Sequence, residues 1–119
     1  MKVIIAGSRN FNDYKKLCKI CDHLLQNQAN VEIVSGAARG ADQLGEKYTK
    51  ERGYKLTKFP ANWNKYGKSA GPKRNEEMAN YADVLIAFWD GKSRGTKNMI
   101  ELANKRKLNV LIFFLIGPH

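Results

Sequence analysis

The chain has 119 residues, of which 43% are hydrophobic and 27% are charged. This composition is typical of a globular protein and excludes a disordered or low-complexity chain, so we expect one domain over residues 1–119. The net charge of +10 favours anionic partners. Because the lysines and arginines are spread along the whole chain, charge alone does not distinguish a nucleotide partner from a nucleic acid.

Apolar runs alternate with helical periodicities in the first half of the chain. Residues 2–6 predict a short buried strand, and residues 13–28 predict an amphipathic helix. A second strand is predicted over residues 31–35. It is followed by a helix over residues 40–52, which Gly53 is expected to cap at its C-terminal end.

The second half continues the alternation after a long insertion. The pattern predicts an edge strand over residues 54–59 that ends at Pro60, a loop over residues 60–71 and a helix over residues 72–81 that begins at Pro72. It then predicts a strand buried on both faces over residues 83–89, a helix over residues 96–107 and a final buried strand over residues 109–115. Such alternation predicts an α/β fold, a Rossmann-like three-layer sandwich with a five-stranded, mostly parallel sheet. Ligands of these sheets bind at the carboxyl ends of the strands, where the strand order reverses.

Cys18 and Cys21 form a Cys-x-x-Cys pair within the helix predicted over residues 13–28. A structural zinc site needs four ligands, and the only two histidines are His23 and His119. We therefore expect inert thiols, no metal site and no cofactor, with a functional role of the thiols as the alternative.

Two further expectations concern location and assembly. The apolar runs near both ends, including residues 110–117, are too short for a signal peptide or a membrane span. We therefore expect a cytoplasmic protein with no membrane partner. A homodimer through the region of Tyr81 or Trp89 is a further hypothesis.

Small and basic residues follow three of the predicted strands. Backbone N–H groups and arginine side chains in such loops are suited to hold phosphate at a helix N-terminus. Asp42 is suited either to cap a helix or to accept from a ribose hydroxyl. Trp63 and Tyr66 form either a wall of the site or the packing of their own loop. The candidate ligand-binding residues are Gly7, Ser8, Arg9, Ser35, Gly36, Arg39, Gly40, Asp42, Trp63, Arg74, Asn75, Gly91, Ser93, Gly95 and Thr96.

Five motifs at these positions together resemble one group of proteins. They are Gly-Ser-Arg-x-Phe at 7–11, Ser-Gly-x-Ala-x-Gly-Ala-Asp at 35–42, Pro-Ala-x-Trp at 60–63, Gly-Pro-x-Arg-Asn at 71–75 and Asp-Gly-x-Ser-x-Gly-Thr at 90–96. The chain resembles the SLOG superfamily, which joins the DprA/Smf proteins and the Lonely-Guy phosphoribohydrolases, and in particular its small YspA/YpsA-related branch, which is often encoded by bacteria and phages. The resemblance spans nearly the whole chain. It implies a Rossmann-like fold that binds a nucleotide or nucleotide-derived ligand at the sheet edge.

The resemblance also implies a departure from Lonely-Guy chemistry. In those enzymes an arginine and a glutamate cleave a nucleoside 5′-monophosphate, and the glutamate lies three residues after a threonine. Arg74 matches the arginine and Thr96 matches the threonine, but Met99 occupies the glutamate position. Glu101 is a poor substitute, because it lies two residues further along the predicted helix.

Three functions therefore remain open. The main interpretation is a domain that binds a nucleotide-derived ligand, such as an ADP-ribose or NAD derivative or a nucleoside phosphate. The alternative is a hydrolase of the N-glycosidic or phosphate bond of such a ligand, with Arg74 and Asp90 as the candidate catalytic residues and Asp42 or Glu76 as other carboxylates. A second alternative is DprA-like binding of single-stranded DNA, which the charge of +10 supports.

Overall fold

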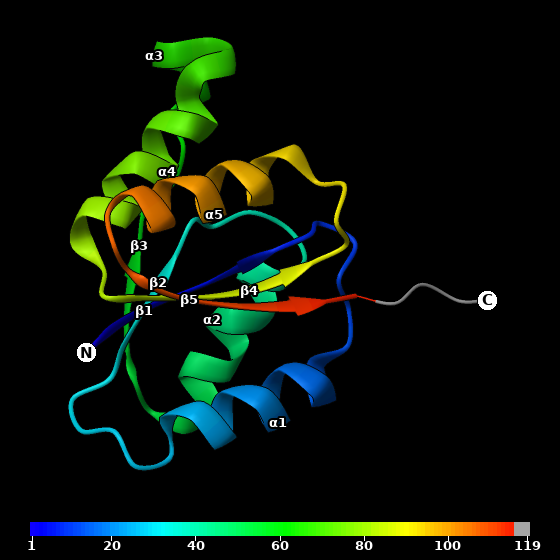
Figure 1. Cartoon of the computed structure of the whole chain (residues 1–119), viewed down its shortest axis with the longest axis vertical. Helices are drawn as coiled ribbons and strands as arrows, with labels where there is room; N and C mark the ends of the chain where they lie inside the picture. Colours follow the sequence, from blue (N-terminus) through cyan, green and yellow to red (C-terminus); the bar gives the residue numbers. More distant parts are fainter. Residues whose placement is uncertain (116–119) are drawn as a thin grey trace.

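A computed structural model describes residues 1–115, with strands and helices alternating as the sequence predicts (Figure 1). The strands are β1 (Lys2–Gly7), β2 (Glu32–Ser35), β3 (Lys55–Lys58), β4 (Val84–Trp89) and β5 (Asn109–Phe114). The α-helices are α1 (Tyr14–Leu25), α2 (Ala41–Arg52), α3 (Trp63–Tyr66), α4 (Ala70–Tyr81) and α5 (Arg94–Lys105), and a 3₁₀ helix, η1, covers Gly67–Ser69. His119 and the last residues of the apolar run at 110–117 lie outside the described part of the chain.

The five strands are all parallel and lie in the order β3-β2-β1-β4-β5, which confirms the predicted α/β fold. The chain moves outward from β1 to β3 and then returns to the other side of β1 with β4. The strand order therefore reverses between β1 and β4. At such a reversal the loops after the two strands leave toward opposite faces of the sheet, and this opens a crevice at its carboxyl edge.

Alternate side chains of each central strand pack into two cores, one on each face of the sheet. Val3 and Ile5 of β1 pack with α1 and α2, whereas Ile4 and Ala6 pack with α4 and α5 (Figure 1). In β4, every residue except the last is buried. The prediction that β1 and β4 are buried is therefore confirmed, as expected for parallel strands covered by helices on both sides.

The Cys-x-x-Cys pair belongs to the packing of α1. Cys21 is fully buried, Cys18 is half-buried, and both are free thiols. Burial raises the pKa of the Cys21 thiol to about 12, which keeps it protonated and unreactive at neutral pH. Within residues 1–115, no group of three or more metal-ligating side chains is arranged to hold a metal ion. No helix in the same range combines the length and the apolar character needed to cross a bilayer.

The loop predicted over residues 60–71 is partly helical, and this corrects the sequence analysis. Asn62 caps α3 by accepting from the backbone N–H of Lys65 (3.1 Å). Helix α4 begins two residues before Pro72, so the proline lies in its first turn rather than at its first position. A helix of four residues shows no apolar periodicity, and therefore the pattern did not reveal it.

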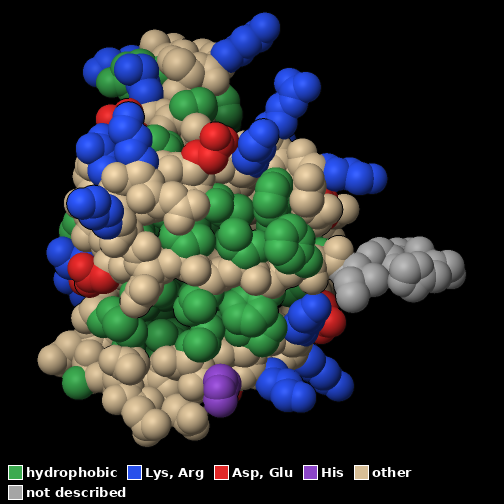
Figure 2. Space-filling model, viewed as in Figure 1, with side chains coloured by type: hydrophobic (Ala, Val, Ile, Leu, Met, Phe, Trp, Pro, Cys, Tyr) green, Lys and Arg blue, Asp and Glu red, His purple; other side chains and the backbone are tan. Residues whose placement is uncertain are grey.

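The last strand is also placed differently from the prediction, because β5 is an edge strand rather than a buried one. Leu111 is 37% exposed and Phe114 is 59% exposed. Figure 2 shows a band of hydrophobic side chains along this edge, between α5 and α1. An apolar run indicates a buried strand, but the run does not reveal which strand of the sheet lacks a neighbour.

The region proposed for a dimer contact is already occupied by contacts within the chain. The hydroxyl of Tyr81 donates to the Glu32 carboxylate, and the indole N–H of Trp89 donates to the Ser93 carbonyl (3.1 Å). Both aromatic rings are half-buried. The homodimer therefore stays a prediction, and the large hydrophobic side chains that are exposed in residues 1–115 are Trp63, Tyr66, Leu111 and Phe114.

Two glycines with positive φ values allow the packing beside the crevice to be tested, although their ψ values of −123° at Gly40 and 24° at Gly53 differ. Gly40 and Gly53 have φ values of 74° and 72°, and Gly53 caps α2 as the sequence predicts. A Cβ added at Gly40 would lie 2.3 Å from the carbonyl oxygen of Ser8, whereas one added at Gly53 would meet nothing within 4 Å. We expect Gly53→Ala to lower the free energy of unfolding by about 1 kcal/mol through backbone strain alone.

Gly40→Ala adds a clash with backbone to a backbone conformation that is less accessible to alanine than that of Gly53, so we expect it to cost roughly twice as much or more in urea denaturation. Equal losses in the two variants would contradict the close approach of the loops after β1 and β2.

Candidate functional site

Three loops meet at the carboxyl edge of the sheet, and Ser8 joins them. Its backbone N–H donates to the carbonyl of Phe88 at the end of β4 (2.9 Å), and its carbonyl accepts from Ala41 at the start of α2 (3.3 Å). Its hydroxyl oxygen accepts from the backbone N–H of Asp90 (3.1 Å). Ser8, a candidate ligand-binding residue, is only 1% exposed, so its side chain is not accessible to a ligand in this structure. The residue positions the loops instead.

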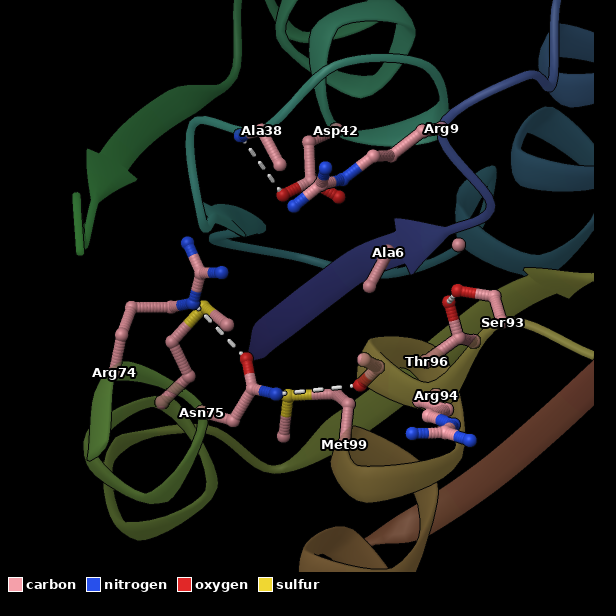
Figure 3. A pocket seen from close by; sticks show the side chains of 13 residues that line it. Ala6, Arg9, Ala38, Asp42, Arg74, Asn75, Ser93, Arg94, Thr96 and Met99 are labelled. Atoms are coloured by element: carbon pink, nitrogen blue, oxygen red, sulfur yellow. Dashed lines mark hydrogen bonds between the residues drawn. The ribbon is translucent and has the colours of Figure 1, made fainter. Parts of the chain in front are cut away.

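The crevice at this edge has two adjacent lobes, which share Arg9, Ala38 and Arg74. The inner lobe, of about 250 Å³, lies between the carboxyl end of β1 and the start of α5 (Figure 3), and its lining includes Ala6, Arg9, Asp42, Arg74, Asn75, Met78, Arg94, Thr96 and Met99. The outer lobe, of about 490 Å³, is lined by Arg9, Gly36, Ala37, Ala38, Arg39, Pro60, Ala61, Trp63 and Arg74. A phosphate placed near the shared arginines would therefore touch both lobes.

The two lobes have the same number of arginines in their linings but differ in the number of carboxylates. Three arginines and no carboxylate line the outer lobe. Three arginines also line the inner lobe, where Asp42 is the one carboxylate in the lining. Arg9, Arg39 and Arg94 are exposed to solvent, so their guanidinium groups are accessible for bidentate pairing with phosphate oxygens.

Arg74 is held in place by contacts on both sides of the crevice. Its Nη1 donates to the carbonyl of Gly36, and its Nε donates to Oδ1 of Asn75 (3.0 Å). Burial lowers the pKa of the Arg74 guanidinium, the charge of Asp42 raises it, and the charge of Arg9 lowers it further. A Cβ added at Gly36 would lie 2.6 Å from Nη1 of Arg74 and 2.9 Å from Oδ2 of Asp42, so a larger residue there would displace the ends of these two side chains.

Asp42 lies in the first turn of α2 but does not cap that helix. Its carboxylate accepts from the backbone N–H of Ala38 (3.2 Å), which precedes the helix, so it stabilises the loop after β2. Burial raises the pKa of Asp42 to about 6, and the nearby charge of Arg74 opposes this rise. A buried carboxyl with a shifted pKa inside a crevice is a common feature of functional sites.

Asp90 organises the loop that precedes α5. Its Oδ1 accepts from the backbone N–H groups of Lys92 and Ser93 (2.8 Å each), and these hydrogen bonds lower the pKa of the carboxyl. The loop thereby brings residues 94–96, the first turn of α5, to the inner lobe, where N–H groups without helical acceptors favour anions. Asp90 itself lines neither lobe, so its catalytic role stays a prediction and its visible role is structural.

Most of the residues predicted from the sequence lie together in the crevice. Those that line one or both lobes are Gly7, Arg9, Gly36, Arg39, Asp42, Trp63, Arg74, Asn75, Ser93, Gly95 and Thr96. Ser8, Ser35, Gly40 and Gly91 line neither lobe. Ser35 is buried, and its hydroxyl donates to the Glu46 carboxylate (2.7 Å).

Sequence reasoning did not include Arg94, Ala38 or Met78 among the crevice residues. Arg94 and Ala38 lie within the recognised motifs, and the predicted start of a helix beside the site was a further signal for Arg94. Met99, which is 1% exposed, lines the inner lobe at the position where Lonely-Guy enzymes carry glutamate. Glu101 is exposed and lines neither lobe, so no glutamate replaces it.

The sequence and the fold of this chain are similar to those of known proteins. Residues 1–66 match the model of the YspA, cpYpsA-related SLOG family. The Gene 61 protein of Mycobacterium phage D29 is 34% identical over 119 residues, which cover 94% of this chain and 95% of that protein.

Two solved structures of DNA processing protein A (DprA) share the fold. The protein from Streptococcus pneumoniae aligns with a TM-score of 0.72 and 20% identity over 93% of this chain and 49% of that chain. The protein from Helicobacter pylori, described for its single-stranded DNA binding mode, aligns with a TM-score of 0.64 and 20% identity over 94% of this chain and 64% of that chain. This chain therefore spans about half to two thirds of those structures.

The buried carboxyl of Asp42 is expected to make stability depend on pH. Its pKa is raised from 3.8 to about 6 by folding, so the native state binds more protons than the unfolded state between these values. The stabilisation that this group contributes is therefore complete below about pH 4 and is lost as the pH rises through about 6. We expect Asp42→Asn, which does not ionise, to be more stable than the unaltered protein at about pH 7.5 and to lose this advantage near pH 4.

Urea denaturation of both proteins at the two pH values measures the difference. A stability difference that does not change with pH would contradict the raised pKa of Asp42.

Proposed function

This chain belongs to the YspA, cpYpsA-related SLOG family, and from that premise we propose that it binds single-stranded DNA through a backbone phosphate held in the crevice. The outer lobe carries the proposal, because three arginines and no carboxylate line it. A fold shared with a protein described for its single-stranded DNA binding mode supports the same partner. The net charge of +10 adds the general attraction that nucleic-acid binding requires.

The chemistry of the crevice suits a phosphodiester. Arg9 and Arg74 border both lobes and repel each other electrostatically, and a phosphate between them would relieve this repulsion. The first turn of α5 lines the inner lobe, which shares both arginines with the outer lobe, and adds the positive end of a helix dipole. These contacts recognise the backbone and not the base, so binding should depend weakly on sequence and strongly on salt.

A free nucleotide is the second candidate, and the inner lobe favours it. This lobe of about 250 Å³ combines arginines with the carboxyl of Asp42, whose oxygen atoms are suited to accept from ribose hydroxyls. If such a ligand is cleaved, Asp42 is the carboxylate of the crevice lining that would touch it, since Asp90 lines neither lobe. Met99 stands where the Lonely-Guy glutamate would be, and this argues against that particular reaction.

The role of Arg9 in DNA binding is directly testable, because no hydrogen bond from its guanidinium supports the fold among the described contacts. We expect Arg9→Gln to weaken binding of a fluorescein-labelled oligothymidylate by roughly tenfold and to reduce the slope of log affinity against log salt by about one, as measured by fluorescence anisotropy.

Arg106→Gln provides the matched control. Arg106 follows the last residue of α5, about 18 Å along the helix from the crevice, and pairs with Glu76 (3.2 Å) at the surface. This variant removes the same charge and should leave the affinity and the salt slope nearly unchanged. Equal losses in both variants would show that net charge alone drives binding.

The pH dependence of DNA binding tests the contribution of Asp42. A phosphodiester does not titrate near neutral pH, whereas the Asp42 carboxyl loses its negative charge as the pH falls through about 6. We therefore expect tighter oligothymidylate binding at about pH 5.5 than at about pH 7.5, and we expect Asp42→Asn to remove the difference. An equal pH effect in the variant would place its cause elsewhere.

Ligand-observed NMR separates the two candidate functions. We expect AMP and ADP-ribose to bind more weakly than the oligonucleotide and to remain intact over hours. Binding of either small molecule at least as tight as that of the oligonucleotide would favour the nucleotide function. New ribose or base signals would show turnover, and their loss in Asp42→Asn would identify the carboxylate.

A further inference from the structure

The α3–η1 segment projects beyond the N-terminal end of α4 (Figure 1). All of its residues are exposed. Trp63 is 53% exposed and Tyr66 is 38% exposed. Large aromatic side chains usually bury most of their surface, because that burial stabilises the fold. An indole left in solvent therefore contributes little to the fold and remains free for a ligand.

The projection has a defined local structure that presents these rings. Asn62 caps α3 at its start, and the hydroxyl of Ser69 donates to the carbonyl of Tyr66 at its end (2.8 Å). A Cβ added at Gly71 would lie 3.4 Å from Cη2 of Trp63, so the edge of the indole rests close to α4. One edge of the ring thus faces α4, while about half of the surface of Trp63 stays open, since the residue is 53% exposed.

The charge of the projection has a single sign. Residues 60–75 contain Lys65, Lys68, Lys73 and Arg74 and no aspartate or glutamate. The Nζ atoms of Lys65 and Lys73 lie 5.0 and 4.9 Å from the centre of the Tyr66 ring. Figure 2 shows basic side chains gathered around this end of the molecule. Aromatic rings interleaved with lysines are typical of surfaces that bind single-stranded nucleic acid.

Trp63 connects this projection to the phosphate crevice. It lines the outer lobe together with Arg9, Arg39 and Arg74. It also borders a separate hollow of about 420 Å³, whose other lining residues are Pro60, Ala61, Asn62 and Asn64. One indole therefore adjoins open space on two sides, and one of these spaces already contains the arginines.

We propose that Trp63 stacks a base of the same DNA strand whose phosphate the crevice holds, and that Lys65 and Lys68 attract the phosphates that follow. The proposal rests on the DNA-binding function proposed above. The occupant is an unpaired strand, because stacking needs a base whose face is free. The strand then runs from the arginines over Trp63 and along the α3–η1 projection.

Trp63→Ala tests the proposal when binding is measured with two oligonucleotides of equal length, one of thymidine and one of abasic sites. The unaltered protein should bind the thymidine strand roughly tenfold more tightly than the abasic strand, because base stacking on an aromatic ring is lost in the second. Trp63→Ala should remove this preference and keep the salt dependence, while Trp63→Phe should restore most of it. Phe114→Ala is the matched control, since it removes an exposed aromatic ring that lines neither lobe.

The outcomes distinguish the two proposals. If the unaltered protein binds neither strand, DNA binding itself is overturned. If it binds both strands equally, or if Trp63→Ala keeps the preference for thymidine, DNA binding stands and the stacking subsite is overturned. Circular dichroism of each variant confirms that the fold is intact before binding is compared.

Discussion

The site depends on the hydrogen bonds that converge on Ser8. One residue contacts the end of β4, the start of α2 and the backbone of Asp90, so the loops after three strands hold fixed positions relative to one another. Gly40 passes so close to the Ser8 carbonyl that a side chain there would clash with it. The buried Ser8 therefore fixes the loops that form the crevice, and the residues that line the crevice remain accessible to a ligand.

The positive charges of the crevice arginines are only partly neutralised by the carboxyl of Asp42. Arg74 is half-buried and held by a backbone carbonyl, and the buried Asp42 lowers the cost of placing it near Arg9. Arg9 and Arg39 remain exposed at the outer lobe. The guanidinium of Arg74 is held in place and is only partly neutralised by Asp42. An anion that binds to it therefore does not have to order this side chain.

Local pattern was sufficient for much of the fold, because parallel strands covered on both faces are continuous apolar runs and amphipathic helices have a clear period. It failed at α3, which spans only about one helical turn, and at β5, where an apolar run does not reveal that the strand lies at an edge. The crevice was predictable because strand order brings the loops together. The burial of Ser8 was not, since it arises from contacts between residues far apart in the sequence.

The two lobes allow the ligand class to be argued from shape as well as charge. Both lobes share Arg9 and Arg74, so a phosphate between these arginines is compatible with a nucleotide and with a polymer. What distinguishes the ligands is where the rest of the molecule lies. A free nucleotide in the inner lobe would not contact the basic projection beyond it. A strand continues outward, and the outer lobe leads from the arginines to Trp63 and then to a surface without acidic residues from 60 to 75. The exposed indole and its lysines are therefore accounted for by an extended ligand and remain unexplained by a small one.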